Sequence, residues 1–312
     1  MEFTTVRVAA VKPSATGSPA PPLKLPELPG RIFENRFIAI KQCKHGIMCF
    51  NKNDLFVGKA LDLYGEWCER EIELLGRFIR PGWVVVDVGA NVGTHTIAFA
   101  GLVGPGGSVY AFEPQRMIFQ LLCSNVALNA LTNVMCLPFG ISNVNGAALI
   151  PVINPYSQSN FGCLGIEGHQ TGDGVRVTTL DSFNFGRCDM IKIDAEGLER
   201  KVLVGAEHLI RDRQPVIFVE NNSEKESPAI IALLKNWGYR CWWHLAPYYN
   251  PDNFFGNPEN VFPRVRNDAS MLCLPREAEG PVEHLIPVEG MDDSRKRVLA
   301  RLLKTGGVGS RS

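Results

Sequence analysis

The stretch Val84-Val-Val-Asp-Val-Gly-Ala-Asn-Val-Gly93 decides the fold of this chain. Three valines run into Asp87, and Gly89 and Gly93 enclose a tight turn before a helix-like stretch that continues to about Leu102. A continuous apolar run is typical of a buried parallel strand. Glycines in the following turn let backbone N–H groups approach a ligand with no Cβ in the way. The stretch therefore predicts a ligand-binding strand, turn and helix.

The spacing of the turn indicates the ligand. A dinucleotide fingerprint is Gly-x-Gly-x-x-Gly, whereas here Asp87 precedes Gly89-x-x-x-Gly93. A carboxylate at that place repels a diphosphate and favours a cationic ligand that carries an ammonium and a sulfonium. Twenty residues after Gly93, Glu113 follows a second apolar run, 108–112. A carboxylate at the tip of the second strand can accept hydrogen bonds from both hydroxyls of a ribose. The pair predicts S-adenosylmethionine (SAM) as the cofactor.

Strands and helices alternate after residue 84, which predicts an α/β fold with a doubly wound, mostly parallel, seven-stranded Rossmann-like sheet and helices on both faces. The first expected strand begins at residue 84. The other six are 108–112, 134–137, 190–194, 214–220, 239–245 and 269–274, of which the last is antiparallel. Two further strands, 147–153 and 175–180, flank a loop at 154–174. A loop of that length inside an α/β unit is usually functional or floppy.

The chain divides into four predicted parts. Residues 1–28 are a Pro/Ala-rich tail that we expect to be disordered. Residues 29–82 hold a hairpin, 37–40 against 47–50, and an amphipathic helix, 64–79, which together cover the site. Residues 83–280 are the SAM-binding domain, and 281–312 are a C-terminal extension, helical or disordered.

Carboxylates stand at most of the strand ends where an open parallel sheet binds its ligands. The five ends are Asp87–Asn91, Glu113–Pro114, Phe139–Gly140, Asp194–Glu196 and Glu220–Asn222. Any one of these acids could serve only as a helix N-cap or as a partner of a helix dipole. Their concentration at one rim of the sheet is more than a purely structural sheet needs, and it predicts the site.

Composition limits the class of protein. The chain has 312 residues, 45% of them hydrophobic and 21% charged, with a net charge of zero. It can therefore bury one sizeable α/β core, and without a Lys/Arg run no nucleic-acid partner is expected. The nine cysteines include no Cys-x-x-Cys pair and predict reduced core residues. No apolar run of membrane-spanning length and no convincing signal peptide stand in the sequence, so a cytoplasmic protein is expected.

Several motifs together resemble the FkbM-type methyltransferases, a class I SAM-dependent family. They are Val-Val-Asp-Val-Gly-Ala-Asn-Val-Gly at 85–93, Phe-Glu-Pro at 112–114, Ser-Asn-Phe-Gly at 159–162, Ile-Lys-Ile-Asp-Ala-Glu-Gly-Leu-Glu at 191–199 and Tyr-Asn-Pro-Asp-Asn-Phe-Phe-Gly-Asn at 249–257. The resemblance covers roughly residues 60–275, and Lys-Ile-Asp-Ala-Glu-Gly is its most specific motif. At 140–143 this chain reads Gly-Ile-Ser-Asn where the family more commonly reads Ala-x-Ser-Asp.

The resemblance implies O-methylation of hydroxyls on sugars, glycolipids, oligosaccharides or other secondary metabolites such as polyketide-type products. It implies that Asp87, Gly89, Ala90, Asn91 and Gly93 hold the methionine part of SAM. It also implies that Glu113 holds the ribose and that residues 139–142 face the adenine. The implied cofactor contacts are Asp87, Gly89, Ala90, Asn91, Gly93, Glu113, Pro114, Phe139 and Gly140. Asp194 and Glu196 would lie beside the reacting methyl group.

We predict that Asp194 with Glu196 accepts the hydroxyl proton, since two carboxylates separated by one residue at a strand tip can reach one site. Desolvation of one of them would raise its pKa and suit it to act as a base. The sequence leaves open whether these acids or Glu220 bind a divalent metal, although no tight His/Cys/Asp cluster predicts a metal site. The predicted contacts to a small-molecule or glycan acceptor are Ser159, Asn160, His244 and Asn253. His244 is also a second candidate base, with a packed strand histidine as the alternative.

Three other functions compete with this hypothesis. An NAD-dependent dehydrogenase would need glycine where the chain has Asn91. A non-catalytic SAM-fold binding protein would be expected to lose Asp87, Glu113 or Asp194, and all three are present. An N-methyltransferase of a small amine or a protein would share every SAM residue and remains the main rival. It would not need a base for an amine that is already neutral.

Overall fold

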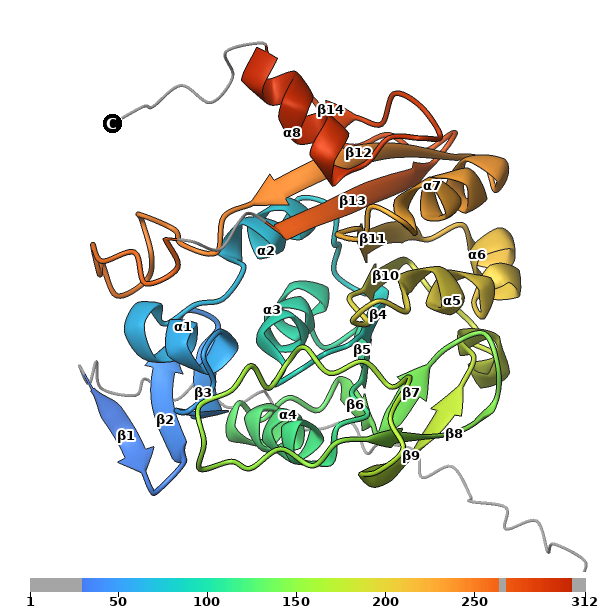
Figure 1. The fold of residues 1–312 in the computed structure, drawn as a ribbon. Helices are drawn as coiled ribbons and strands as arrows, with labels where there is room; N and C mark the ends of the chain where they lie inside the picture. The colour runs from blue at the N-terminus through green and yellow to red at the C-terminus, as the bar shows by residue number, and fades with distance from the viewer. Residues whose placement is uncertain (1–29, 264–267, 305–312) are drawn as a thin grey trace, which may run out of the picture.

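The computed structural model describes residues 30–263 and 268–304 (Figure 1). The tail predicted at 1–28 and the last part of the predicted extension, 305–312, lie outside the described residues. The described chain forms one eight-stranded sheet with helices on both faces and two three-stranded sheets beside it.

The large sheet has the strand order β14-β12-β13-β11-β10-β4-β5-β6. Its parallel centre consists of β4 Val84–Val88, β5 Ser108–Phe112, β6 Val134–Leu137, β10 Met190–Ile193 and β11 Val216–Glu220. Antiparallel pairing adds β13 Asp268–Pro275, β12 Tyr239–Ala246 and β14 Ile286–Pro287. The predicted α/β class is confirmed, and the seven predicted strands are present with the two-residue β14 added at one edge.

Strand order reverses between β4 and β10, because the chain after β4 adds strands on one side and β10 adds them on the other. Residues of β4 alternate between the two faces of the sheet. Val85 packs into a core with Phe99 of α3 Thr94–Val103. Val86 packs into the core of the other face with Val202 of α5 Glu199–Val204. Both faces are therefore buried, and the reversal leaves a crevice at the carboxyl ends of the strands.

The remaining helices complete the two layers. They are α1 Val57–Tyr64, α2 Glu69–Gly76, α4 Arg116–Leu128, η1 Leu180–Phe183, α6 Glu207–Arg213, α7 Ser227–Asn236 and α8 Arg295–Lys304. In the described part of the chain, no helix combines the length and apolarity that crossing a membrane requires.

Two small sheets stand beside the large one. The first contains β1 Arg31–Glu34, β2 Ile38–Cys43 and β3 Gly46–Asn51, which confirms the predicted hairpin because Ile40 pairs with Cys49. The second contains β7 Phe139–Ile141, β8 Gly146–Ile150 and β9 Asp173–Thr178. The strands predicted at 147–153 and 175–180 thus exist in slightly shifted form and pair with each other.

The prediction of a single helix at 64–79 is wrong. The chain forms α1 and α2 with a break between them, where Gly65 and Cys68 take left-handed φ values of 69° and 49°. The break turns Trp67 onto Tyr248, with ring centroids 5.1 Å apart, and lets Glu66 accept hydrogen bonds from the loop at 250–254. Contacts with a distant loop have overridden the local helical pattern.

Residues 286–298 pack on the far edge of the large sheet. β14 pairs with β12, and Trp243 donates a hydrogen bond from Nε1 to Asp293 Oδ2 at 3.1 Å. Val298 of α8 is fully buried. In Figure 1, α8 lies across this edge, away from the crevice.

Candidate active site

A cavity lies at the carboxyl ends of β4, β5 and β10, next to the reversal of strand order. Its wall is completed by β7, by the start of α4 and by residues 161–166, which we call the strap. The site therefore occupies the place where open α/β sheets bind their ligands.

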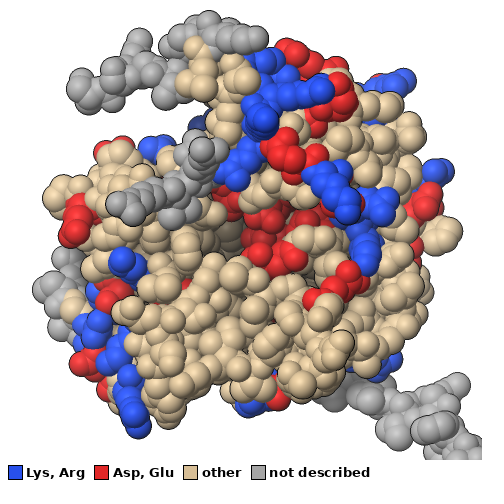
Figure 2. Space-filling view, in the orientation of Figure 1, with Lys and Arg blue, Asp and Glu red and all other residues tan. Residues whose placement is uncertain are grey.

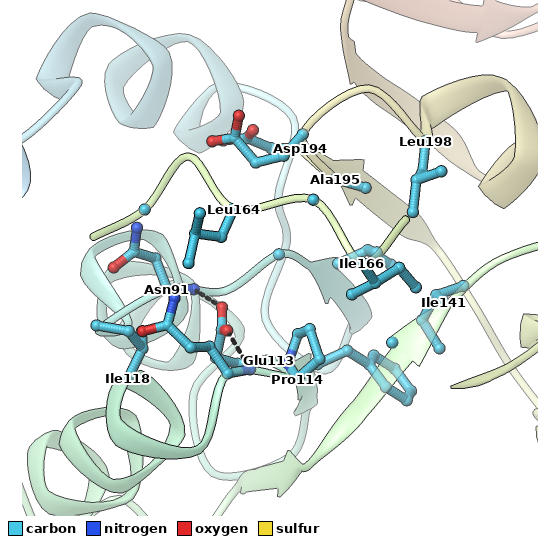
Figure 3. A pocket seen from close by; sticks show the side chains of 18 of the residues that line it. Asn91, Glu113, Pro114, Ile118, Ile141, Leu164, Ile166, Asp194, Ala195 and Leu198 are labelled. Carbon is cyan, nitrogen blue, oxygen red and sulfur yellow. Dashed lines mark hydrogen bonds between the residues drawn. The ribbon is translucent and has the colours of Figure 1, made fainter. Parts of the chain in front are cut away.

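The strap comes from the long loop that the sequence marked as functional or floppy. It is held down by Phe161, which is fully buried and whose carbonyl accepts a hydrogen bond from Gln115 Nε2 at 2.9 Å. Leu164 and Ile166 then reach the cavity on the side opposite Glu113 and Pro114 (Figure 3). The strap thus forms one wall of the cavity.

Glu113 stands at the tip of β5 and joins two strand ends. Its Oε2 accepts a hydrogen bond from the backbone N–H of Asn91 at 3.0 Å, and its Oε1 accepts one from Gln115 at 2.8 Å (Figure 3). The residue is 8% exposed, and this burial raises the pKa of Glu113 to about 7 against the opposing effect of the two N–H groups. Each carboxylate oxygen keeps a second lone pair for a ligand.

Asp194 and Glu196 form the opposite end of the cavity. The tips of β4 and β10 touch here, since a Cβ on Gly89 would lie 1.7 Å from the carbonyl oxygen of Asp194. The side chain of Asp194 is 37% exposed. Glu196 lines the same end and is exposed, and partial burial of its carboxyl group, followed by repulsion from Asp194 and Glu199, raises the pKa of Glu196 to about 8.

Further carboxylates surround this end, and Figure 2 shows Asp and Glu gathered in a hollow at the centre of the visible face. Asn222 donates from Nδ2 to both Glu220 and Asp268, which ties the end of β11 to the start of β13. Burial and repulsion from nearby carboxylates, including Asp194, raise the pKa of Asp268 to about 6 and that of Glu220 well above its ordinary range. The hollow is therefore crowded with carboxyl groups and disfavours anions.

Eight of the residues predicted to contact the cofactor or the methyl group line this cavity. They are Gly89, Asn91, Glu113, Pro114, Phe139, Gly140, Asp194 and Glu196. Three others, Asp87, Ala90 and Gly93, do not line it: Asp87 is fully buried, Ala90 is 3% exposed and Gly93 caps α3. Their place behind the wall suits a supporting role, and direct contact between them and a ligand stays a prediction.

The four predicted acceptor contacts lie outside the cavity. His244 lines a separate cavity between α2 and residues 281–302. Asn253 is 4% exposed and donates to the carbonyls of Asn250 and Asn257 within its own loop. Ser159 and Asn160 belong to turns that anchor the strap, through a bridge to Asp54 and a hydrogen bond from Gly162. Contact between these residues and an acceptor stays a prediction.

The sequence reasoning missed most of the apolar part of the wall. The missed residues are Ile118, Leu164, Ile166 and Leu198. Single apolar residues carry no pattern that separates a cavity wall from a core, and only the length of the loop at 154–174 pointed to Leu164 and Ile166. As for the metal left open above, residues 30–263 and 268–304 contain no group of three or more His, Cys, Asp or Glu side chains placed to hold one.

The cavity fits SAM in three respects. Phe139, Ile141 and Ile166 give an apolar end suited to a purine ring, and Glu113 offers fixed acceptors for ribose hydroxyls in the middle. The acidic end then attracts a sulfonium and an ammonium. The wall thus changes from apolar to acidic in the same order as the parts of the cofactor.

The doubly wound sheet, with a cavity at the carboxyl ends of its parallel strands, is the fold of the class I SAM-dependent methyltransferases. Residues 87–241 match the family described as the methyltransferase FkbM domain. The 31-O-demethyl-FK506 methyltransferase FkbM of Streptomyces tacrolimicus is 27% identical over 215 residues, which cover 58% of this chain and 82% of that relative. The chain belongs to the FkbM methyltransferase family.

Solved structures also match at low identity. One is the methyltransferase FkbM from Methylobacillus flagellatus KT, with a TM-score of 0.40 and 17% identity over 61% of this chain and 43% of that chain. Another is the TYW2 protein of M. jannaschii in complex with AdoMet, with a TM-score of 0.43 and 14% identity over 78% of this chain and 89% of that chain. The dehydrogenase and the non-catalytic binding protein considered above find no support in the family match.

Proposed function

We propose that this enzyme O-methylates a hydroxyl of a small polyhydroxylated acceptor, such as a sugar, a glycolipid or a secondary metabolite, with Asp194 as the proton acceptor. The observation that carries the proposal is the position of Asp194, on the cavity wall and beside an ammonium, Lys192, 3.3 Å away. A hydroxyl needs a base as its oxygen attacks, whereas a neutral amine does not. The acidic end supplies such a base next to the place suited to the sulfonium.

SAM supplies the methyl group and the positively charged leaving sulfur. Glu113 holds the ribose hydroxyls, and the strap excludes water from the space beside them. Asp194 accepts the hydroxyl proton on a carboxylate oxygen. Glu196, with a pKa of about 8, is mostly protonated at neutral pH and can donate a hydrogen bond to the acceptor. Two neighbouring carboxyl groups thereby take opposite roles.

The charge of the hollow narrows the acceptor class. An acceptor with a phosphate or carboxylate near its reacting hydroxyl would be repelled by the acids at the ends of β10 and β11. Neutral and cationic acceptors are favoured. The zero net charge of the chain also gives no support for a nucleic-acid acceptor.

The test is transfer of label from methyl-labelled SAM by the purified full chain to a panel of neutral sugars and polyols, amino sugars and sugar phosphates. Mass and NMR analysis of the product distinguishes an O-methyl from an N-methyl group. Asp194→Asn should lower kcat roughly 100-fold or more while the Kd for SAM changes little.

Asp212→Asn, at an exposed aspartate of α6, is the matched control and should keep full activity. An N-methylated product, with Asp194→Asn almost as active as the unchanged enzyme, would overturn the proposal in favour of the N-methyltransferase.

A further inference from the structure

Lys192 is a buried lysine in the centre of the large sheet. It lies on β10 directly opposite Asp87 of β4, and its side chain is 4% exposed. Its Nζ lies 3.3 Å from Asp194 Oδ2, 3.4 Å from the carbonyl oxygen of Gly89 and 3.6 Å from Asp87 Oδ1. The contacts with Asp194 and Gly89 are hydrogen bonds, and the contact with Asp87 is an ion pair that is too long for a hydrogen bond.

The two carboxylates at this ammonium differ in their surroundings. Asp87 is fully buried; its Oδ2 accepts a hydrogen bond from Thr96 Oγ1 at 2.6 Å, while its Oδ1 has no hydrogen-bond partner among the described residues. Asp194 faces the cavity with 37% of its side chain exposed. One ammonium therefore connects a carboxylate of the core with a carboxylate of the active site.

Acidic groups dominate the rest of the neighbourhood of Asp194. The titratable groups that act on it electrostatically are Cys68 and Glu71 from the α2 region, His95 from α3, Glu196 and Glu199 after β10, Glu220 from β11, Tyr248 after β12 and Asp268 from β13. His95 is neutral at pH 7, because burial lowers its pKa to about 4. Burial opposes the charge on Lys192, but the acids around it outweigh burial and raise its pKa.

Lys192 is therefore the cation of this described neighbourhood that persists at neutral pH. Without it, Asp194 would stand among these acids with no positive charge beside it, and their repulsion would favour its protonated form. A protonated Asp194 could not accept a proton from a hydroxyl.

We propose that Lys192 is a positioning residue that keeps Asp194 ionised and directed toward the acceptor, with Asp87 anchoring the ammonium from behind. The inference rests on the proposed O-methylation, in which the O–H bond breaks, the proton passes to Asp194 and the oxygen bonds to the methyl group. Lys192 keeps its own protons throughout. It acts on the reaction only through Asp194.

Two variants separate this role from simple support of the fold. Asp87→Asn removes the buried Asp87–Lys192 ion pair but leaves the ammonium beside Asp194. The double variant Asp87→Asn/Lys192→Met removes the same ion pair and the ammonium as well. Lys192→Met alone is avoided, because it would leave Asp87 buried without a counter-charge. Both chosen variants lack a buried unpaired charge.

The readouts are the pH profile of kcat and a carboxyl ¹³C NMR titration of the SAM-free protein, with Asp194→Asn used to assign the Asp194 signal. For Asp87→Asn, the pH midpoint of the acid limb of kcat should be no higher than in the unchanged enzyme. The same holds for the pH midpoint of the Asp194 titration. For the double variant, both should move up by about 1 to 2 pH units. Lys201→Met, at an exposed lysine paired with Glu167, should move neither.

Each outcome either supports or contradicts the proposed role of Lys192. If the two variants give the same acid limb and the same Asp194 titration, Lys192 only supports the fold and the inference is wrong. If Asp194→Asn keeps full kcat, the proposed base is wrong instead, whatever the NMR titrations show. A shift in the double variant alone supports the positioning role.

Discussion

The Glu113 end and the Asp194 end of the cavity present the same functional group in two different settings. Both residues stand at tips of strands that flank β4. Glu113 is 8% exposed and its oxygens accept two backbone N–H groups. Asp194 is more open, with 37% of its side chain exposed, and it accepts a hydrogen bond from the buried ammonium of Lys192. A carboxylate closed in by N–H groups suits binding, and an open one beside a cation suits proton transfer.

The largest expected effect is the loss of stability on substitution of Gly89, because the backbone of this residue lies between the Glu113 end and the Asp194 end of the cavity. Gly89→Ala would place a Cβ 1.7 Å from the carbonyl oxygen of Asp194, at a φ of 75° that disfavours alanine. We expect the free energy of unfolding to fall by about 2–4 kcal/mol in a urea titration.

The matched control is Gly101→Ala in α3, where a Cβ would meet no atom within 4 Å. It should leave stability unchanged or raise it by up to about 1 kcal/mol. Equal stability of the two variants would mean that the tips of β4 and β10 are not held in contact.

A smaller effect is expected when only the binding end is changed. Glu113→Gln keeps the shape of the side chain but loses the charge, so the Kd for SAM measured by calorimetry should rise about 10- to 100-fold. At saturating SAM, kcat should change less than about threefold, the reverse of the pattern expected for Asp194→Asn.

Glu207→Gln, at an exposed i,i+4 ion pair on α6, serves as the control and should alter neither value. A collapse of kcat with an unchanged Kd in Glu113→Gln would show that the two ends do not divide binding from chemistry.

The smallest effect concerns pH. The pKa of Glu113 is raised from its ordinary 4.5 to about 7 by burial, so the folded SAM-free protein prefers the protonated form. Its contribution to stability is present below about pH 4.5 and is lost as pH rises through about 7. Binding of ribose hydroxyls favours the ionised form instead, so the Kd for SAM should fall roughly 3- to 10-fold between pH 6 and 7 and then level off.

Subtracting the same measurements on Glu113→Gln isolates this carboxyl group from the other acids of the hollow. A pH dependence that survives unchanged in Glu113→Gln would assign the titration to another residue.

Features that depend on neighbours along the chain were predictable. The apolar run of β4, the turn at Gly89 and the acids at the strand tips could be placed because backbone preference and strand direction are local properties. The meeting of Asn91, Glu113 and Asp194 at one rim follows from them, because the carboxyl ends of parallel strands lie at the same edge. The break between α1 and α2 did not follow, since the left-handed φ of Cys68 accompanies packing of Trp67 on a loop distant in sequence.

By itself, the sequence determined the order of strands and helices, the glycine turn and the kind of side chain at each strand tip. Only the tertiary structure decided that Asp87 is buried, that the strap forms part of the cavity wall and that Lys192 is shared between Asp87 and Asp194. The physical reason is that burial and ion pairing depend on which side chains of distant segments come together, whereas strand, turn and tip are specified by residues adjacent in the chain.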